Sequence, residues 1–458
     1  MAFNQQSAPL PLRPLPLRPL GLPPRPRKRP APELPVQEED PPEVAPAELD
    51  DTWQSLEVLD VEMASQLELG TGGISSDKVV LGTDCSGLDT FKVALDAVLV
   101  KGGKDVVHAF ASDNRLWARK FIKKHNPGLC IVCSDITKRP NKQTPYVDIY
   151  CASLPNNGQY TAQELSDGVD NPHDKDIVTM HVLNYIKEKR PKAFLLESRA
   201  HLYSASMKPE MAAVHGYLQK KLTTESGDPS YYVWSDPMDA RCDGGLPQAS
   251  QRLFFVGILK TAVDPRAVSN PLTLSQMEEK SLADVLDPYV APLSRPDFDE
   301  PPGLSPAQLR NYKKVKDWLE PAIDVKMPNP PGNQIIISDL SVGPTRDPDT
   351  LRGCSIGLTP SRPNGYFIWG RQRFMTTTEM ESLQAIPNDH FKHDGIISEN
   401  QYKKLVAEAP PAPIVGRVLR KILLQVKLPP AIVEPDPWCP SSGWAKAKAY
   451  PPVFPYFD

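Results

Sequence analysis

The sequence predicts an α/β protein built on a doubly wound, mostly parallel sheet. Two observations support this fold class: short apolar runs bounded by turn residues recur along residues 78–261, and segments with helical spacing separate the first of them. Strands that alternate with helices form βαβ units, whose strands lie parallel in one sheet. The length of 458 residues allows two or three domains and a sizeable core.

The expected elements follow one another in a simple order. Residues 78–83 predict a buried strand, residues 91–100 a helix, residues 108–112 a second strand and residues 115–124 its helix. Further strands are expected at residues 130–133, 148–151, 192–196 and 253–259. Ligands of such sheets bind beyond the carboxyl ends of the strands, so the residues that follow each strand are the candidates for a site.

Acidic residues stand at the ends of the first three strands. Asp84 ends the first strand, and Ser86 and Gly87 form the turn after it. Asp113 follows the second strand, where a carboxylate suits the ribose hydroxyls of a nucleoside, and Asp135 follows the third. One such residue often serves only the turn, but three along one sheet edge predict a nucleoside pocket. The first strand is not followed by GxGxxG, which disfavours a dinucleotide.

The two ends of the chain are unlike its centre. Of 52 prolines, 14 fall in the first 50 residues, so residues 1–75 are predicted to be a disordered Pro-rich arm, basic and then acidic. The basic cluster at residues 25–29 fits a nuclear address, a ligand for an SH3-type partner or a solvated linker. Residues 429–458 are predicted to form a Pro-rich tail.

Composition excludes several protein classes. The net charge of -4 is not that of a polycation, and no run of eighteen apolar residues is present, which predicts a soluble intracellular protein without a membrane segment. Seven cysteines suit free thiols in a reducing compartment. Cys130 and Cys133 have the spacing of half a zinc site, but no second pair accompanies them, so no metal is expected.

The order of the motifs resembles that of the DNA cytosine-5 methyltransferases over roughly residues 78–425. The matching stretches are the turn Asp84–Leu88, "VDIYCASLPNNGQYT", "RPKAFLLESRAHL", "GGLPQASQRLFFVGI" and the late "LTPSRPNGYFIWGRQRFMTTTEMESLQAIP". The resemblance implies a Rossmann-like fold that binds S-adenosylmethionine, with DNA as the partner. It assigns Glu197, Gln248 and Arg252 to the active site and adds Pro155 to the cofactor-binding residues. It also implies a catalytic domain at residues 76–261, completed by residues 351–428, and a target-recognition-like insert at residues 262–350.

One departure from the family pattern concerns the nucleophile. Asn156 stands where the family has its catalytic cysteine, and Asn157 replaces the glutamine that follows. The family reaction adds a thiolate to C6 of cytosine, and a carboxamide cannot make that addition. Cys151 lies five residues upstream, about 16 Å along an extended strand, and is expected to point into the core of the sheet. The sequence therefore predicts impaired methyl transfer.

Other departures agree with this prediction. Ser198 and Arg199 replace the residues that normally follow the glutamate, and Ser250 replaces the first arginine of the Gln-x-Arg-x-Arg motif. The late Gly-Asn pair falls on Pro411 and Ala412, although the apolar helix at residues 415–424 persists.

The insert carries a basic helix. Ser305 is a predicted N-cap before Pro306, and the helix carries Arg310, Lys313 and Lys314. These cations fit phosphate contacts or an ordinary solvated helix face. Arg371 and Arg373 near the late motif are the candidates for a second phosphate surface.

Three hypotheses about function follow. The chain is an active cytosine-5 methyltransferase with another nucleophile, a catalytically impaired member that binds DNA, cofactor or a protein partner, or a methyltransferase of another chemistry. The third requires an Asp/Asn/Ser-Pro-Pro-aromatic loop, which "SLPN" matches poorly because it lacks the aromatic residue and the second proline.

Overall fold

We analysed a computed structural model of the chain. It describes residues 56–58, 78–99, 106–139, 141, 144–154, 177–199, 222–223, 227–287, 301–319, 332–387, 390–428, 433 and 436–438. The chain divides into two units, Met1–Leu49 and Asp50–Asp458, and all described residues belong to the second.

An eight-stranded sheet forms the centre of this unit, in the order β1-β4-β3-β2-β5-β6-β9-β7. Its strands are β1 (Leu56–Val58), β2 (Val79–Asp84), β3 (Val106–Ser112), β4 (Leu129–Cys133), β5 (Ile149–Ser153), β6 (Ala193–Arg199), β7 (Tyr231–Asp239) and β9 (Gln251–Leu259). Strands β4, β3, β2, β5 and β6 run parallel, whereas β9 pairs antiparallel with both β6 and β7. The predicted α/β class and mostly parallel sheet are confirmed.

The strand order reverses direction beside β2. From β2 the chain adds β3 and β4 on one side, and then returns to place β5 and β6 on the other. Such a reversal leaves a crevice at the carboxyl ends of the central strands, where open α/β sheets bind their ligands. The turns after β2, β3, β4 and β5 therefore meet at one edge.

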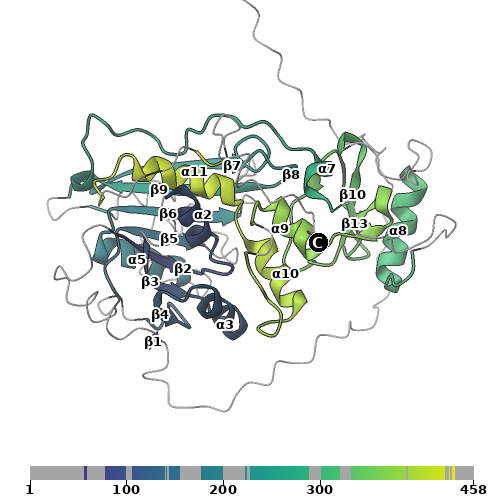
Figure 1. Ribbon diagram of the computed structural model, residues 1–458, viewed down its shortest axis with the longest axis horizontal. Coiled ribbons are helices and arrows are strands. Elements are labelled where there is room, and N and C mark those ends of the chain that lie inside the picture. The colour runs from purple at the N-terminus through teal and green to yellow at the C-terminus, as the bar shows by residue number, and fades with distance from the viewer. Residues whose placement is uncertain are drawn as a thin grey trace, which may run out of the picture. The chain divides into compact units, whose positions relative to one another are not determined.

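Helices cover both faces of the sheet (Figure 1). Helices α2 (Thr90–Val98) and α11 (Ala412–Leu423) lie side by side on one face, where they share a hydrophobic core with Leu81 and Ile149. Helix α5 (Ile177–Lys189) packs on the other face against Val80 and Tyr150. The side chains of neighbouring strand residues therefore point to opposite faces of the sheet. Because helices bury both faces, the strands are largely apolar.

Two strands of the sheet were missed in the sequence. Strand β1 lies inside residues 1–75, which were predicted to be a disordered arm, and pairs antiparallel with β4. Strand β7 alternates between buried and partly exposed residues and contains Pro237, so it lacks the continuous apolar run of the other strands. Its position at the edge of the described sheet is consistent with that proline, which has no amide to donate.

A second, four-stranded sheet has the order β11-β10-β13-β14. It consists of β10 (Ile336–Asp339), β11 (Thr350–Arg352), β13 (Tyr366–Ile368) and β14 (Arg373–Phe374). Helix α8 (Pro306–Leu319) packs its Tyr312 against Phe367 and Trp369 of this region. The sheet crosses the boundary predicted at residue 350, because β13 pairs with β10 of the insert and β14 pairs with β13.

Shorter elements connect the two sheets. They are β8 (Gln248–Ala249), β12 (Ser355–Ile356), α7 (Leu282–Val285), α9 (Thr377–Leu383), α10 (Glu399–Glu408), and the turns Lys260–Ala262, Gly332–Gln334 and Trp369–Arg371. Helix α3 (Leu116–His125) contributes Ala118 and Phe121 to a core that also contains Leu405 of α10 and Ile337 of β10. This shared core fixes α10 near the carboxyl ends of β2 and β3.

The described part of the tail packs on α11. Asp436 forms an ion pair with Arg417 at 2.7 Å, and Val433 bridges to Leu99. Trp438 lies so close to Gly416 that a Cβ there would meet its ring at 2.1 Å, so only glycine admits this contact. Among the described residues, no helix is long and apolar enough to cross a bilayer.

Candidate active site at the carboxyl edge of the sheet

The carboxylate of Asp84 is fully buried and already paired. It accepts hydrogen bonds from both terminal nitrogens of Arg139 at 2.7 and 2.6 Å, and a third from the Tyr150 hydroxyl at 2.6 Å. Arg139 also lies over the Phe110 ring, 4.9 Å from its centroid. The assignment of Asp84 to the cofactor-binding residues stays a prediction, and side chains of the protein already hold its carboxylate. Its acceptor sites face the α5 side of the sheet and hold a structural ion pair.

The turn after β2 keeps the geometry of a ligand-binding loop. Gly87 has φ +54°, a conformation that favours glycine, and a Cβ there would find its nearest atoms 3.9 Å away. Ser86 is buried, and its hydroxyl pairs with the Thr83 hydroxyl at 2.8 Å. A Cβ on Gly87 would thus be in ordinary van der Waals contact with Arg115 and Leu405, whereas Ser86 belongs to the core.

Asp113 is the acid best placed for a ribose. It follows β3 at the carboxyl edge of the sheet, and its carboxylate receives the Gly87 amide at 3.1 Å. Arg115 donates three further hydrogen bonds to it, from the backbone amide at 2.9 Å and from two guanidinium nitrogens at 3.0 Å each. The structure therefore brings Asp113 and Gly87 together as predicted, with an arginine that the sequence analysis missed.

The third acid and the nucleophile loop lie farther along the same edge. One oxygen of Asp135 accepts the Thr137 amide at 2.9 Å and the Thr137 hydroxyl at 2.7 Å, a turn-capping role. Its contact with an adenine edge stays a prediction. Pro155, Asn156 and Asn157 lie outside the described residues, which end at Leu154 and resume in α5.

Glu197 and Arg252 form the second buried ion pair of the site. The arginine donates to the glutamate at 2.9 Å, and both side chains are almost fully buried. Glu197 lies opposite Ser153 in the β5–β6 pairing, and its carbonyl accepts the Leu154 amide at 2.7 Å. The loop that carries Asn156 therefore starts directly beside this glutamate.

The remaining motif residues surround this pair. Gln248 is completely buried, and among the described residues neither of its side-chain polar atoms has a hydrogen-bond partner. Such a group is costly unless something pairs with it. Ser198 is buried in β6, and the amide of Ser250 donates to the Gln248 carbonyl at 3.0 Å.

A chain of charges joins the two halves of the site. Arg115 forms an ion pair with Glu408, at the end of α10, at 2.7 Å. Arg252 donates to the backbone carbonyls of Glu408 and Ala409 at 3.2 and 3.0 Å. The arginine network, which we define as Asp113, Arg115, Glu408, Arg252 and Glu197, thus ties α10 to the ends of β3 and β6.

A buried Asp–His pair lies beneath the Gly87 turn. The Asp89 carboxylate is 3.6 Å from Nδ1 of His108, whose Nε2 is 3.1 Å from the Thr83 hydroxyl. Burial raises the pKa of Asp89 to about 7 and lowers the pKa of His108 to about 3. Between these values the pair holds one proton and no net charge, whichever residue carries it.

This pair predicts a pH dependence of stability. Because the folded pKa of Asp89 lies above its ordinary value of 3.8, folding takes up a proton between these values, and stability falls as pH rises toward 7. We expect the stability of Asp89→Asn relative to the wild type to be about 2 kcal/mol more favourable at pH 8 than at pH 5. Urea unfolding at both pH values measures it, with exposed Asp317→Asn as the control. An unchanged difference would contradict the shift.

The predicted nucleic-acid contacts separate into two groups. Arg310, Lys313 and Lys314 are exposed on α8, and Lys314 also pairs with Asp347. Arg373 is buried and donates to both oxygens of Glu379, at 2.8 and 2.7 Å. Its assignment as a phosphate contact stays a prediction, and the capping carboxylate of α9 already pairs with its charge. Arg371 is half-buried and donates to the Asp287 carbonyl.

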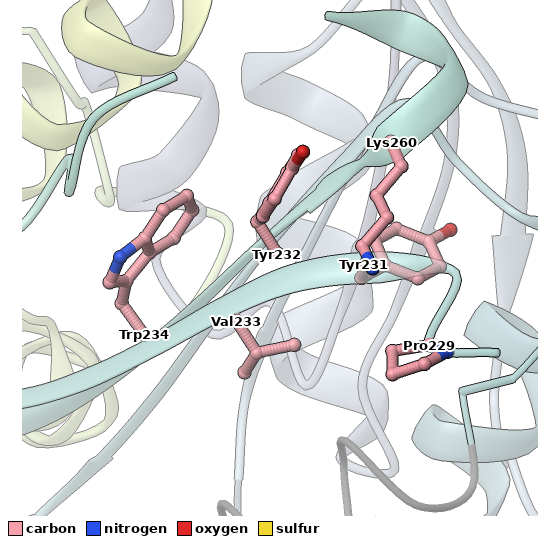
Figure 2. Close-up of a pocket in the computed structure, with 6 residues that line it drawn as sticks. All are labelled: Pro229, Tyr231, Tyr232, Val233, Trp234 and Lys260. Carbon is pink, nitrogen blue, oxygen red and sulfur yellow. The ribbon is translucent and has the colours of Figure 1, made fainter. Parts of the chain in front are cut away.

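A pocket of about 270 Å³ lies away from this site, on β7 (Figure 2). Tyr231, Tyr232, Val233 and Trp234 line it together with Pro229 and Lys260. These residues pair with the end of β9 that faces the start of β6, so the pocket is at the amino ends of the parallel strands. It therefore does not belong to the candidate site.

Comparisons with known proteins give one family and one fold. A family model of C-5 cytosine-specific DNA methylases matches residues 85–424. The type II methyltransferase M.DdeI of Desulfomicrobium norvegicum is 23% identical over 181 residues, 38% of this chain and 41% of the relative. M.NlaX of Neisseria lactamica is 26% identical over 185 residues, 40% of this chain and 53% of the relative. The chain thus spans about half the length of these curated relatives. The structure of the methyltransferase EhMeth of Entamoeba histolytica shares the fold, with a TM-score of 0.50 and 14% identity over 76% of this chain and 98% of that one.

Proposed function

Because the chain belongs to the C-5 cytosine-specific DNA methylase family, we propose that it is a member whose fold persists and whose methyl transfer to cytosine in DNA is impaired. The observation that carries this proposal is Asn156 at the position of the nucleophilic cysteine. The pairing of Ser153 with Glu197 supports the alignment, because the loop after β5 starts beside the family's glutamate. Glu197, Gln248 and Arg252 are then the residues inherited from the active site.

The buried ion pairs support the same proposal. Arg252 pairs with one oxygen of Glu197 and with two backbone carbonyls, so any contact of the glutamate with a base edge has to be made beside this charged partner. Removing one partner from a buried pair leaves an uncompensated charge, which costs several kcal/mol. The domain limits that we propose are residues 76–261 and 351–428 for the methyltransferase fold. The small sheet contains strands from both sides of the limit at residue 350, because β10 pairs with β13.

The family uses S-adenosylmethionine, which supplies the methyl group. In this chain the residues that fit its adenosine portion are Asp113 and the Gly87 turn, because they lie together at the carboxyl edge of the sheet. We assign Asp135 and Pro155 to the same pocket, whereas Asp84 and Ser86 support it from within the core. The altered late motif at Pro411 weakens this pocket.

We expect weak cofactor binding without turnover. In a calorimetric titration with S-adenosylhomocysteine, the wild type should bind at high micromolar to millimolar concentration, and Asp113→Ala should bind more weakly because the ribose acceptor is gone. A parallel assay with labelled S-adenosylmethionine and unmethylated DNA should transfer no label. Label on cytosine would refute the impaired-enzyme proposal, and the lack of any heat at millimolar ligand would refute the cofactor assignment.

A role as a DNA-binding scaffold is a second candidate, favoured by the exposed cations of α8. Because Arg310, Lys313 and Lys314 would contact phosphates, binding should weaken steeply with salt and depend little on sequence. Replacing all three by glutamine should lower affinity for a DNA duplex at 50 mM salt by about tenfold or more. Fluorescence anisotropy measures this, and an affinity that salt does not change would contradict it.

The N-terminal arm adds two further proposals. Its basic cluster at residues 25–29 fits nuclear import, and its repeated Leu-Pro-Leu-Arg-Pro fits an SH3-type partner. Residues 1–55 lie outside the described residues, so both proposals rest on the sequence.

A further inference from the structure

Arg115 occupies hydrogen-bond acceptor positions of Asp113, the carboxylate that a nucleoside would need. An aspartate offers about four acceptor positions on its two oxygens. On Asp113 the Gly87 amide, the Arg115 amide and two guanidinium nitrogens of Arg115 take four hydrogen bonds, at 2.9 to 3.1 Å. Asp113 is 4% exposed, so little of it remains for solvent. A ribose diol can therefore reach this carboxylate only if the guanidinium moves away.

Arg115 has contacts other than those with Asp113. Its third guanidinium nitrogen pairs with Glu408 of α10 at 2.7 Å, and its guanidinium lies 4.7 Å from the Trp117 ring centroid. Arg115 and Glu408 are both partly exposed, with side chains 28% and 35% accessible. If the guanidinium releases Asp113, it keeps Glu408 as a charged partner. Its partial exposure allows this movement.

We infer that Arg115 is an internal competitor that limits entry of the adenosine moiety of the cofactor to the Asp113 site. This inference rests on the proposed function, because it concerns the cofactor pocket of that same site. Ligand binding exchanges two hydrogen bonds from the positively charged guanidinium of Arg115 for two from uncharged ribose hydroxyls, so the attraction between opposite charges at Asp113 is lost. The arginine therefore lowers cofactor affinity without touching the reacting atoms.

Removing the guanidinium should raise affinity. We expect Arg115→Ala to bind S-adenosylhomocysteine about tenfold or more tightly than the wild type in calorimetry, because the ligand no longer has to separate the guanidinium from the Asp113 carboxylate. Arg115→Met should show the same gain while keeping an unbranched apolar chain beside Trp117, which guards against a loss of folding. Arg119→Ala is the matched control, since Arg119 donates only to the carbonyls of Asp113 and Asn114.

Two further measurements test whether the gain in affinity comes from hydrogen bonds between the ribose and Asp113. Adenosine should show the gain in Arg115→Met, and 2′-deoxyadenosine should not, because it lacks one of the hydroxyls. Adding Asp113→Asn to Arg115→Met should abolish the gain. Equal affinities of the wild type and both Arg115 variants would overturn the inference and leave the proposed function intact. Methyl transfer by the wild type would refute the proposed function whatever Arg115 does.

Discussion

DNA that contains 5-fluorocytosine should form no covalent adduct with this protein. The analogue captures a cytosine-5 methyltransferase only after a thiolate has added to C6 and the methyl group has been transferred. In the proposed alignment, Asn156 offers a carboxamide at the thiolate's position. Incubation with S-adenosylmethionine, followed by denaturing electrophoresis, measures the adduct, and a family enzyme that keeps its cysteine is the positive control.

The two described cysteines nearest the site are unsuited to replace the nucleophile. Cys151 lies within β5, is completely buried and packs in the core with α2 and α11, and burial raises the pKa of its thiol. Cys85 lies in the turn after β2, where burial and the charges of Asp84 and Asp113 raise the pKa of its thiol. A raised pKa suppresses the thiolate, which is the reactive form.

Restoring the cysteine alone should not restore trapping. Groups of an active site act together, so one recovered group without its supporting residues gives little rate. In Asn156→Cys the changes at Asn157 and Ser250 remain, and Arg252 still holds Glu197. An adduct from the unmodified protein would overturn the assignment of Asn156, and an adduct from Asn156→Cys would show that the rest of the site still supports the reaction.

Arg139→Leu should be among the most destabilising single substitutions in the chain. Among the described residues, the change leaves the fully buried Asp84 carboxylate with only the Tyr150 hydroxyl as a side-chain partner, and breaking a buried pair in this way costs about 3–5 kcal/mol. Tyr150→Phe should cost less, about 1–3 kcal/mol, because the charge keeps its arginine. Urea unfolding followed by circular dichroism measures both values.

A double variant and a surface pair provide the controls for this prediction. Asp84→Asn together with Arg139→Leu should recover much of the loss, because no buried charge remains unpaired. Arg346→Leu breaks an exposed pair with Asp349, whose side chains are 58% and 47% accessible, and should cost at most about 1 kcal/mol. If Arg139→Leu costs no more than Arg346→Leu, the buried pair is not important for stability.

The sequence predicted the centre of the fold well because its signals there are local. Residues 78–83, 108–112 and 130–133 are apolar runs with turns at their ends, and they became β2, β3 and β4 within two residues. Helix α8 likewise begins at Pro306, after the predicted N-cap Ser305. Strand β1 was missed because three residues are too short for any period to be visible, and only pairing with β4 makes them a strand.

Along the site, the sequence by itself determined which residues stand at the carboxyl edge of the sheet, since Asp84, Asp113 and Asp135 each follow a strand. It also predicted that Asn156, in the loop after β5, stands where the family has its cysteine. It did not determine which carboxylates are available, because Arg139 and Arg252 each lie 55 residues from the acid that they neutralise. Partners so far apart meet only through strand register and helix packing, which residue spacing does not encode. The tertiary structure therefore decided that Asp84 is a core ion pair, that Arg373 is a helix contact, and that Asp113 keeps its place at the edge with Arg115 bound to it.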